Sequence, residues 1–362
     1  DFHQVTPKEF STPSEKTEVW VAYDENHLYV AAKLYESDMS SVKAGQLIQG
    51  RDYEFDDQFH VVIDTFNSQQ SGYFFQLNAN GVRRDALIDN DNFHGEWDAI
   101  WHAKTTINQD AWVVEMAIPF KSISFDPAVT AWGINFGRVK NQLKEVMAWS
   151  SKGADSWEMA PQAAGQLLGI SGIKQGRGLD VKVSAALIKS NKPAQDFSFE
   201  PSLDVFYKPS ADKTLAATFN TDFSATEVDD RVVNLSRFSV FLPEKRDFFL
   251  EDMDIFEFGQ IQGNGKPFFS RRIGLDASGQ PTDLNVGIKY TGRSDLYNDG
   301  LLGVEQENGM GMSQTLFVGR AQRNVLASSQ IGMIATLGNP NNGDSDRLYG
   351  VDFKYRNSTF LN

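Results

Sequence analysis

The feature that most constrains the fold is an alternation of apolar and polar residues in the second half of the chain. Between Leu179 and Leu187 every second residue is apolar, and the intervening residues include Asp, Lys and Ser. The same alternation recurs over 197–207, 215–223, 284–290, 331–337 and 349–355. Successive side chains of a strand point to opposite faces, so these runs predict β-strands with one apolar and one polar face.

Two environments are compatible with such strands. The chain has no run of about 18 apolar residues, so no transmembrane helix is expected. Transmembrane β-strands of about ten residues, however, show the same alternation of apolar and polar residues as these runs. Aromatic residues at strand ends, namely Tyr207, Phe223, Tyr290 and Tyr355, are typical of the interfacial girdle of a membrane barrel. The pattern alone leaves open a soluble antiparallel sheet with one face on a core. Roughly nine strands follow Gly178, so a barrel would be incomplete in this chain.

The first half consists of shorter β-rich runs between turns. Glu18–Tyr23 and Leu28–Ala32 flank the turn Asp24–His27, which predicts a hairpin. Further runs are Gln58–Ile63, Tyr73–Leu77, Ala99–Thr106, Trp112–Ala117, Trp132–Phe136 and Val146–Ser150. Many short strands predict a β-sandwich. All seven Trp lie in this half, the last being Trp157. We therefore expect an all-β protein of two domains, a sandwich over 1–172 and an antiparallel sheet over 179–362.

The composition excludes several classes of function. The chain has 34 Lys and Arg against 48 Asp and Glu, a formal net charge of −14. This balance argues against nucleic acid as a partner, since binding phosphates requires a basic surface. The absence of Cys excludes a disulfide scaffold, a thiol nucleophile and Cys-ligated metals. No Gly-x-Ser-x-Gly motif or His-rich metal spacing occurs either.

A set of motifs in the first half stands in a recognisable order. It comprises Val19–Asp24 with Leu28–Val30, Asp56–Asp57 before Val62–Asp64, Trp112–Glu115 with Ile118–Phe120, Trp132–Asn135, and Trp157 before Gly165–Leu167. Over about residues 15–172 the chain resembles a carbohydrate-binding module of family 9. The resemblance implies a β-sandwich that binds a saccharide.

A second set of motifs spans both halves. It comprises Arg51–Asp52, Ile63–Phe66, Asn78–Val82, Trp97 with Trp101, Asn220–Ser224, Asn234–Phe238, Pro243–Arg246, Phe248–Glu251 and Ser270–Gly274. The whole chain resembles an uncharacterised family that joins such a domain to a porin-like barrel in the outer membrane of Gram-negative bacteria. The resemblance implies lipid around the barrel and an envelope protein that binds saccharides and lets them pass, without catalysis of its own. In such barrels the turns on the periplasmic side are short. The short turn at Ser210–Lys213 therefore leads us to expect the first domain in the periplasm.

The first resemblance also implies site residues. In that family two Trp sandwich one sugar ring. By the motif match Trp157 takes one place, and Tyr53 or Phe55 falls at the other. His60 and Gln76 fall where the family has an acidic and a basic residue. The alternative for Trp157 is packing in a core or at a hinge.

Two further groups in the first half are candidates for a site. Trp97 and Trp101 are four residues apart, which puts both on one face of a strand as an aromatic strip or as core. Asp89, Asp91 and Glu96 supply the oxygen ligands that calcium prefers, although they lack the spacing of an EF-hand loop. An acidic turn exposed to solvent is the alternative.

Two other functions remain open from the sequence. Asp52 and Asp57 belong to an acidic cluster, and two carboxylates held about 5–10 Å apart can hydrolyse a glycosidic bond. The chain would then be a glycoside hydrolase. A purely structural domain of an envelope transport or secretion complex is the third class, which no particular motif supports.

The segment 243–283 stands apart from the predicted strands. It contains the charged residues Glu244, Arg246, Arg271 and Arg272 together with several Phe. A segment of this length in a compact protein favours a structured role. We expect it to form a plug or constriction in the lumen of the barrel, where charged residues set selectivity.

Overall fold

The computed structural model describes the chain with the exception of 90–91, 152, 154–156, 189–197, 221–243, 260, 262–264, 276–281, 295, 308–310, 326–328, 340–345 and 356–362. The chain divides into two compact units, 1–176 and 177–362. Both units consist almost entirely of antiparallel strands, so the all-β prediction is confirmed. Among the described residues, no helix has the length and apolar character needed to cross a membrane.

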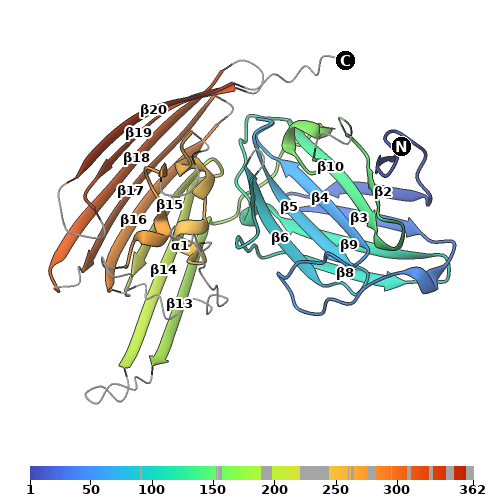
Figure 1. The fold of residues 1–362 in the computed structure, drawn as a ribbon, viewed down its shortest axis with the longest axis horizontal. Coiled ribbons are helices and arrows are strands. Elements are labelled where there is room, and N and C mark those ends of the chain that lie inside the picture. The colour runs from blue at the N-terminus through green and yellow to red at the C-terminus, as the bar shows by residue number, and fades with distance from the viewer. Residues whose placement is uncertain are drawn as a thin grey trace. The chain divides into compact units, whose positions relative to one another are not determined.

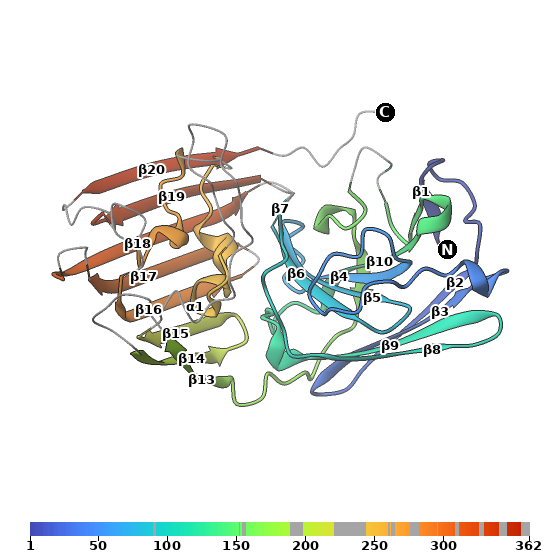
Figure 2. The same ribbon diagram turned by 60° about the horizontal axis from the view of Figure 1, so that its bottom comes forward.

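The first unit contains two antiparallel sheets. The larger has the order β1 (His3–Thr6), β11 (Glu145–Ala148), β10 (Ala131–Lys140), β4 (Gln58–Asp64), β5 (Ser71–Asn78), β6 (Arg83–Asp89) and β7 (Asn92–His94), and β12 (Gly165–Leu168) also pairs with β10. The smaller has the order β2 (Thr17–Tyr23), β3 (His27–Tyr35), β9 (Ala111–Pro119) and β8 (His102–Ile107). Short 3-10 turns at Met39–Ser41, Phe120–Ser122, Asn141–Leu143 and Pro161–Ala163 connect the strands. Figure 2 shows the two sheets as the layers of a sandwich.

The sandwich core follows from the period of two along each strand. On β3, Leu28 and Val30 are buried while Tyr29 between them is exposed. On β4 all seven residues are buried, because Phe59 and Val61 belong to the core between the sheets and Val62 to a second buried cluster on the other face. Burial of each such side chain contributes roughly 1.5–3 kcal/mol to folding, which makes this inner layer the main source of stability.

Buried charges tie the two sheets together. Arg138 of β10 donates to Glu36 at 2.5 Å and to the carbonyl of Tyr35, which ends β3. Lys140 donates to the other carboxylate oxygen of Glu36 and lies 3.3 Å from Glu15. Burial lowers the pKa of Arg138, and the carboxylate of Glu36 acts against that shift. The cluster fixes how β10 is placed against β3.

The second unit is one antiparallel sheet in which each strand pairs with the next along the chain (Figure 1). Its strands are β13 (Leu179–Ile188), β14 (Ser198–Ser210), β15 (Lys213–Phe219), β16 (Leu284–Arg293), β17 (Tyr297–Glu307), β18 (Ser313–Val325), β19 (Ser329–Leu337) and β20 (Arg347–Lys354). The short turn predicted at Ser210–Lys213 joins β14 to β15, where Ser210 pairs with Lys213. No ladder among the described residues joins β13 to β20, so the predicted barrel is an open sheet here, with eight strands instead of nine.

The two faces of this sheet differ as the alternation predicts. Residues in register across seven strands form an apolar row on one face, namely Val181, Val205, Ala217, Ile288, Gly303, Phe317 and Leu337. The next row begins on the opposite face with Lys182, Asp204 and Thr218. The expected plug segment covers part of that opposite face and contains α1 (Asp247–Leu250) and 3-10 turns at Met253–Phe256 and Ser270–Arg272.

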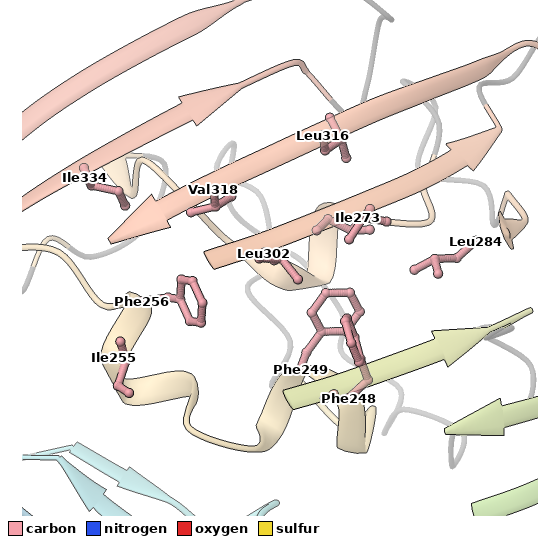
Figure 3. Close-up of a cluster of buried hydrophobic side chains, with 12 residues drawn as sticks. Phe248, Phe249, Ile255, Phe256, Ile273, Leu284, Leu302, Leu316, Val318 and Ile334 are labelled. Carbon is pink, nitrogen blue, oxygen red and sulfur yellow. The ribbon is translucent and has the colours of Figure 1, made fainter. Parts of the chain in front are cut away.

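A hydrophobic cluster holds this segment on the sheet. Figure 3 shows Phe248, Phe249 and Phe256 of the segment pointing toward Leu302 and Val318 of the strands. All five side chains are buried, with exposed fractions of 5% or less. The segment is therefore an integral part of the second unit's core.

Candidate functional site

Three polar side chains lie in one row on the face of the larger sheet that points away from the sandwich core. His60 on β4 pairs with Gln76 on β5, which pairs with Arg84 on β6. The residues next to them, such as Phe59 and Phe75, point into the core because strand neighbours alternate. We call His60, Gln76 and Arg84 the polar row.

The polar row holds buried atoms that have no hydrogen-bond partner. Both ring nitrogens of His60 lack one, as do Oε1 of Gln76 and Nε of Arg84. Burial lowers the pKa of His60 to about 3, so the ring is neutral at physiological pH. Gln76 donates through Nε2 to Gln58 Oε1 at 2.5 Å. Unpaired buried polar atoms cost roughly 1–3 kcal/mol each and are uncommon, so this row is the candidate for contact with a bound molecule. These atoms are closed to solvent in the structure.

Aromatic rings continue from the polar row. The ring of Phe74 lies 5.6 Å from His60 and packs edge-on against Phe93 at 5.2 Å. Phe93 in turn packs edge-on against Trp157 at 6.1 Å, and the guanidinium of Arg84 lies over Phe93 at 4.7 Å. Phe93 and Trp157 are partly buried, and both pack on a buried cluster formed by Val62, Phe74, Ala86 and Ile88. We call Phe74, Phe93 and Trp157 the aromatic row.

Asn135 on β10 positions Trp157. Its Nδ2 donates to the carbonyls of Ser150 and Glu158, each at 2.8 Å, and its Oδ1 accepts from the Ser150 amide. Because these bonds fix the chain on both sides of Trp157, the indole is held where the sheet places Asn135. From the sequence, Asn135 is recognisable only as part of the motif Trp132–Asn135.

The structure separates the other two aromatic candidates from this arrangement. Tyr53 is buried and its hydroxyl donates to the carbonyl of Val82, so its ring is structural. Burial raises the pKa of this hydroxyl. Phe55 is 74% exposed and makes no ring contact with any described residue. The sugar sandwich inferred from the family resemblance is therefore not formed by Tyr53 and Trp157.

Trp97 and Trp101 lie in the sandwich core. Trp97 is 5% exposed and Trp101 1% exposed, and both rings pack edge-on against Phe75. A strip for a glycan requires open ring faces, which these residues do not have. Their burial agrees with the core alternative.

The expected acidic sites have structural contacts. Asp57 is buried and accepts from the backbone amides of Lys43 and Asn141, and its burial raises the pKa of the carboxyl. Asp52 is exposed and pairs with Arg84 at 3.0 Å. These contacts give Asp57 a role in fixing loops and do not favour a catalytic pair.

The suggested calcium site finds no support in the described part of the chain. No three His, Asp or Glu side chains there gather closely enough to hold a metal ion. Asp89 ends β6 and Glu96 lies in the turn after β7, whereas Asp91 lies outside the described residues.

The charged residues of the expected plug are bound within the segment. Glu244 and Arg246 form a buried pair at 2.8 Å, and Arg246 also donates to the carbonyls of Ser270 and Ile273. Arg271 is buried and Arg272 is partly buried. Arg246 therefore holds the two parts of the segment together.

Two residues of these rows, Arg84 and Phe93, were not predicted as site residues from the sequence. Arg84 is recognisable only through the register that aligns it with Gln76 and His60 across three strands. Phe93 lies on the short β7, which no alternating run indicates. Both positions depend on pairing between strands, which a pattern along one strand does not contain.

Residues 183–311 match a family model described as a domain of unknown function, DUF5916. No curated protein matches the chain. Among solved structures, a carbohydrate binding module of family 9 from Caldicellulosiruptor kristjanssonii in complex with cellotriose is similar, with 16% identity over 47% of this chain and 84% of that chain and a TM-score of 0.33. Its complex with glucose gives 15%, the same coverages and 0.34. Values of this size assign neither a ligand nor an activity to this chain.

Proposed function

We propose that the first unit binds a saccharide on the polar and aromatic rows, and that the second unit lies in the outer membrane with its apolar face against lipid. The observation that carries the first part is the presence of unpaired hydrogen-bonding atoms on His60, Gln76 and Arg84, which the aromatic row connects to the partly buried Trp157. The protein would bind saccharides at the cell envelope and would also let them pass, without chemistry of its own.

A saccharide matches both rows. The C–H face of a sugar ring is apolar and stacks on an aromatic ring, while its hydroxyls both donate and accept. His60, once neutral, offers one donor and one acceptor, Gln76 offers an acceptor and Arg84 a donor. A site with an apolar wall and a few oriented polar groups is the usual form of a small-molecule site.

The second part rests on the apolar face of the eight-stranded sheet. Val183, Leu187 and Val351 are exposed by 79%, 76% and 73%. Further large apolar side chains exposed on this sheet are Leu179, Val181, Phe199, Phe219, Ile288, Leu301, Ile331, Met333, Tyr349 and Phe353. A contiguous apolar surface of this kind requires an apolar partner, because exposing it to water costs roughly 25 cal/mol per Å². Lipid is that partner for an alternating antiparallel sheet.

The opposite face of the same sheet is suited to water and to polar solutes. Thr218 donates to Asp204, and Ser184 and Ser202 share a hydrogen bond of 2.5 Å on the same face. Lys182 pairs with Asp247 of the plug segment at 2.5 Å. We propose further that a saccharide passes along this face, beside the plug segment.

Binding to the complete chain in detergent tests the saccharide site. Calorimetric titration with a panel of neutral and acidic oligosaccharides should show binding that Trp157→Ala weakens about tenfold, the loss of one stacking contact. Gln76→Leu should weaken it as well. Phe55→Ala is the control, because this exposed ring lies outside the two rows. Equal binding by wild type and Trp157→Ala, or no binding of any oligosaccharide, would contradict the proposal.

Single cysteines test the membrane part, since the chain has none of its own. A fluorophore at Val183→Cys should be quenched by spin-labelled lipid in reconstituted vesicles. The same fluorophore at Ser184→Cys, one residue along β13 and on the opposite face, should not. Equal accessibility of the two sites to a water-soluble quencher, without any effect of the lipid label, would exclude a bilayer around this sheet.

A further inference from the structure

Trp20 differs from every other tryptophan of the chain. It is 55% exposed, whereas the other six are buried or partly buried, and all seven lie among the described residues. Its side chain has no hydrogen bond, and its ring no aromatic or cationic neighbour, among those residues. It lies on β2, on the outer face of the four-stranded sheet, because its neighbours Val19 and Val21 point toward the core.

A second aromatic ring lies diagonally across the strand pair. Trp20 is the register partner of Ala31, and Tyr29 is the register partner of Ala22 and of Ala117 on β9. Diagonal neighbours on one face are about 7–8 Å apart between Cα atoms, within reach of one extended ligand. The alanines around the two rings are small, so Trp20 and Tyr29 are the large exposed side chains of this surface, with exposed fractions of 55% and 38%. The hydroxyl of Tyr29 donates to Asp24 at 2.9 Å, which holds its ring in place. We call Trp20, Tyr29 and the three alanines the aromatic platform.

Hydrogen-bonding groups border the platform. Glu115 on β9 continues the Trp20 row after Ala31 and pairs in register with Lys104 on β8. Both side chains are exposed, and neither has an ion-pair partner among the described residues. Two more charges, Glu18 and Lys33, lie opposite each other in the next row of this face. Glu18 and Lys33 are already paired with Lys16 and Asp110, and Asp24 accepts from the hydroxyl of Tyr29. Charges of both signs therefore border the platform and largely offset one another, which favours a ligand without a large net charge.

We infer that the aromatic platform is a second saccharide-binding surface, for a neutral polysaccharide that lies flat across β2, β3 and β9. Two rings stack on sugar units of one chain, and Glu115 and Lys104 bond the hydroxyls at its edge. The sugar site proposed above lies on the other sheet of the sandwich, and the two sites share no residue. Two sites on one domain raise the apparent affinity for a polymer, since the second contact is intramolecular.

The test uses the complete chain and two probes. Co-sedimentation with insoluble cellulose and affinity electrophoresis in soluble mixed-linkage β-glucan measure binding to neutral polymers, and polygalacturonate is the acidic counterpart. Trp20→Ala should weaken binding to a neutral polymer about tenfold, the equivalent of one lost stacking contact. It should leave binding of a short oligosaccharide unchanged, whereas Trp157→Ala should weaken that binding. Failure of this inference and failure of the sugar site proposed above therefore give different results.

Controls separate binding from folding and from self-association. Ile107→Ala removes a side chain of the same sheet that is 56% exposed and lies outside the platform, and it should bind the polymer as wild type does. Tyr29→Phe keeps the ring and should also bind. Unchanged polymer binding by Trp20→Ala would overturn the inference. Sedimentation that showed a dimer dependent on Trp20 would overturn it as well, because the platform would then be an interface between two copies.

Discussion

The imidazole of His60 occupies the space above Gly137, its register partner on the adjacent strand β10. A Cβ at position 137 would overlap the Nε2 and Cε1 atoms of the ring. The glycine has ordinary backbone angles, so the absence of a side chain, and not an unusual conformation, is what this position requires. His60 can therefore take its place at the β10 side of the polar row because residue 137 has no side chain.

Gly137→Ala should destabilise the first unit by about 1–3 kcal/mol, because the buried ring has no solvent-exposed position into which it can move. Urea unfolding followed by Trp fluorescence measures this unit alone, since all seven Trp lie within 1–176. His60→Ala in the same background should restore most of the loss by opening the space. If the double variant is no more stable than Gly137→Ala, the overlap with His60 is not the cause.

The strands were predictable because alternation is a local property. The hairpin at Asp24–His27 and the rows of the second unit follow from the period of two and from turn residues. The composition of the candidate site was less predictable. Trp157 and His60 were predicted from a family resemblance. Whether an aromatic ring projects outward or inward depends on which sheet covers it, which the sequence does not show. Trp97 and Trp101, predicted as a possible strip for a glycan, are buried for this reason.

Two buried groups of the first unit should make its stability depend on pH with opposite signs, and the raised pKa of Asp57 acts in the same direction as that of Asp85. Burial raises the pKa of Asp85 to about 7, so its contribution is complete below the unfolded value of 3.8 and is lost as the pH rises toward 7. Burial lowers the pKa of His60 to about 3, so its contribution is complete above 6.5 and is lost as the pH falls. Between pH 4 and 6.5 the two slopes oppose each other.

A variant that removes one of the two groups should reveal the pH dependence that the other group causes. The free energy of unfolding of His60→Gln should fall as the pH rises from 4 to 7, and that of Asp85→Asn should rise from 4 to 6.5. Each slope is at most about 1.4 kcal/mol per pH unit. Urea titrations at several pH values, followed by Trp fluorescence, measure both. Parallel profiles for wild type and the two variants would show that neither group titrates with folding.

Glu36 should be the most sensitive charged residue of the sandwich. It is buried between Arg138 and Lys140, so Glu36→Gln leaves the buried Arg138 without an anionic partner and Lys140 with Glu15 alone, and it should cost about 3–5 kcal/mol. Glu18→Gln breaks an exposed pair with Lys16 and should change the free energy of unfolding very little. Similar unfolding free energies for the two variants would mean that the buried cluster is not held by its charges.

The charged residues of the second unit illustrate a further limit of sequence reasoning. The alternation places Lys289, Thr291 and Arg293 on one face of β16, but it does not show what they bind. In the structure Thr291 donates to Asp252 and Arg293 to Asp254, both in the plug segment. Such contacts join positions about 40 residues apart, and only the folded segment brings them together.

Lys289 should control how firmly the plug segment is held. Its buried ammonium donates to the carbonyls of Phe248 and Glu251, the first within α1 and the second at its end. Lys289→Met keeps the length of the side chain and removes both donors, which leaves two carbonyls unpaired at about 1–3 kcal/mol each. Limited proteolysis in detergent should then cut within 247–258 at least about tenfold faster, provided that cleavage follows local opening. Lys182→Met is the control, because it breaks only a partly exposed pair with Asp247. Equal cleavage rates in the two variants would mean that the phenylalanine cluster alone, and not Lys289, holds the segment on the sheet.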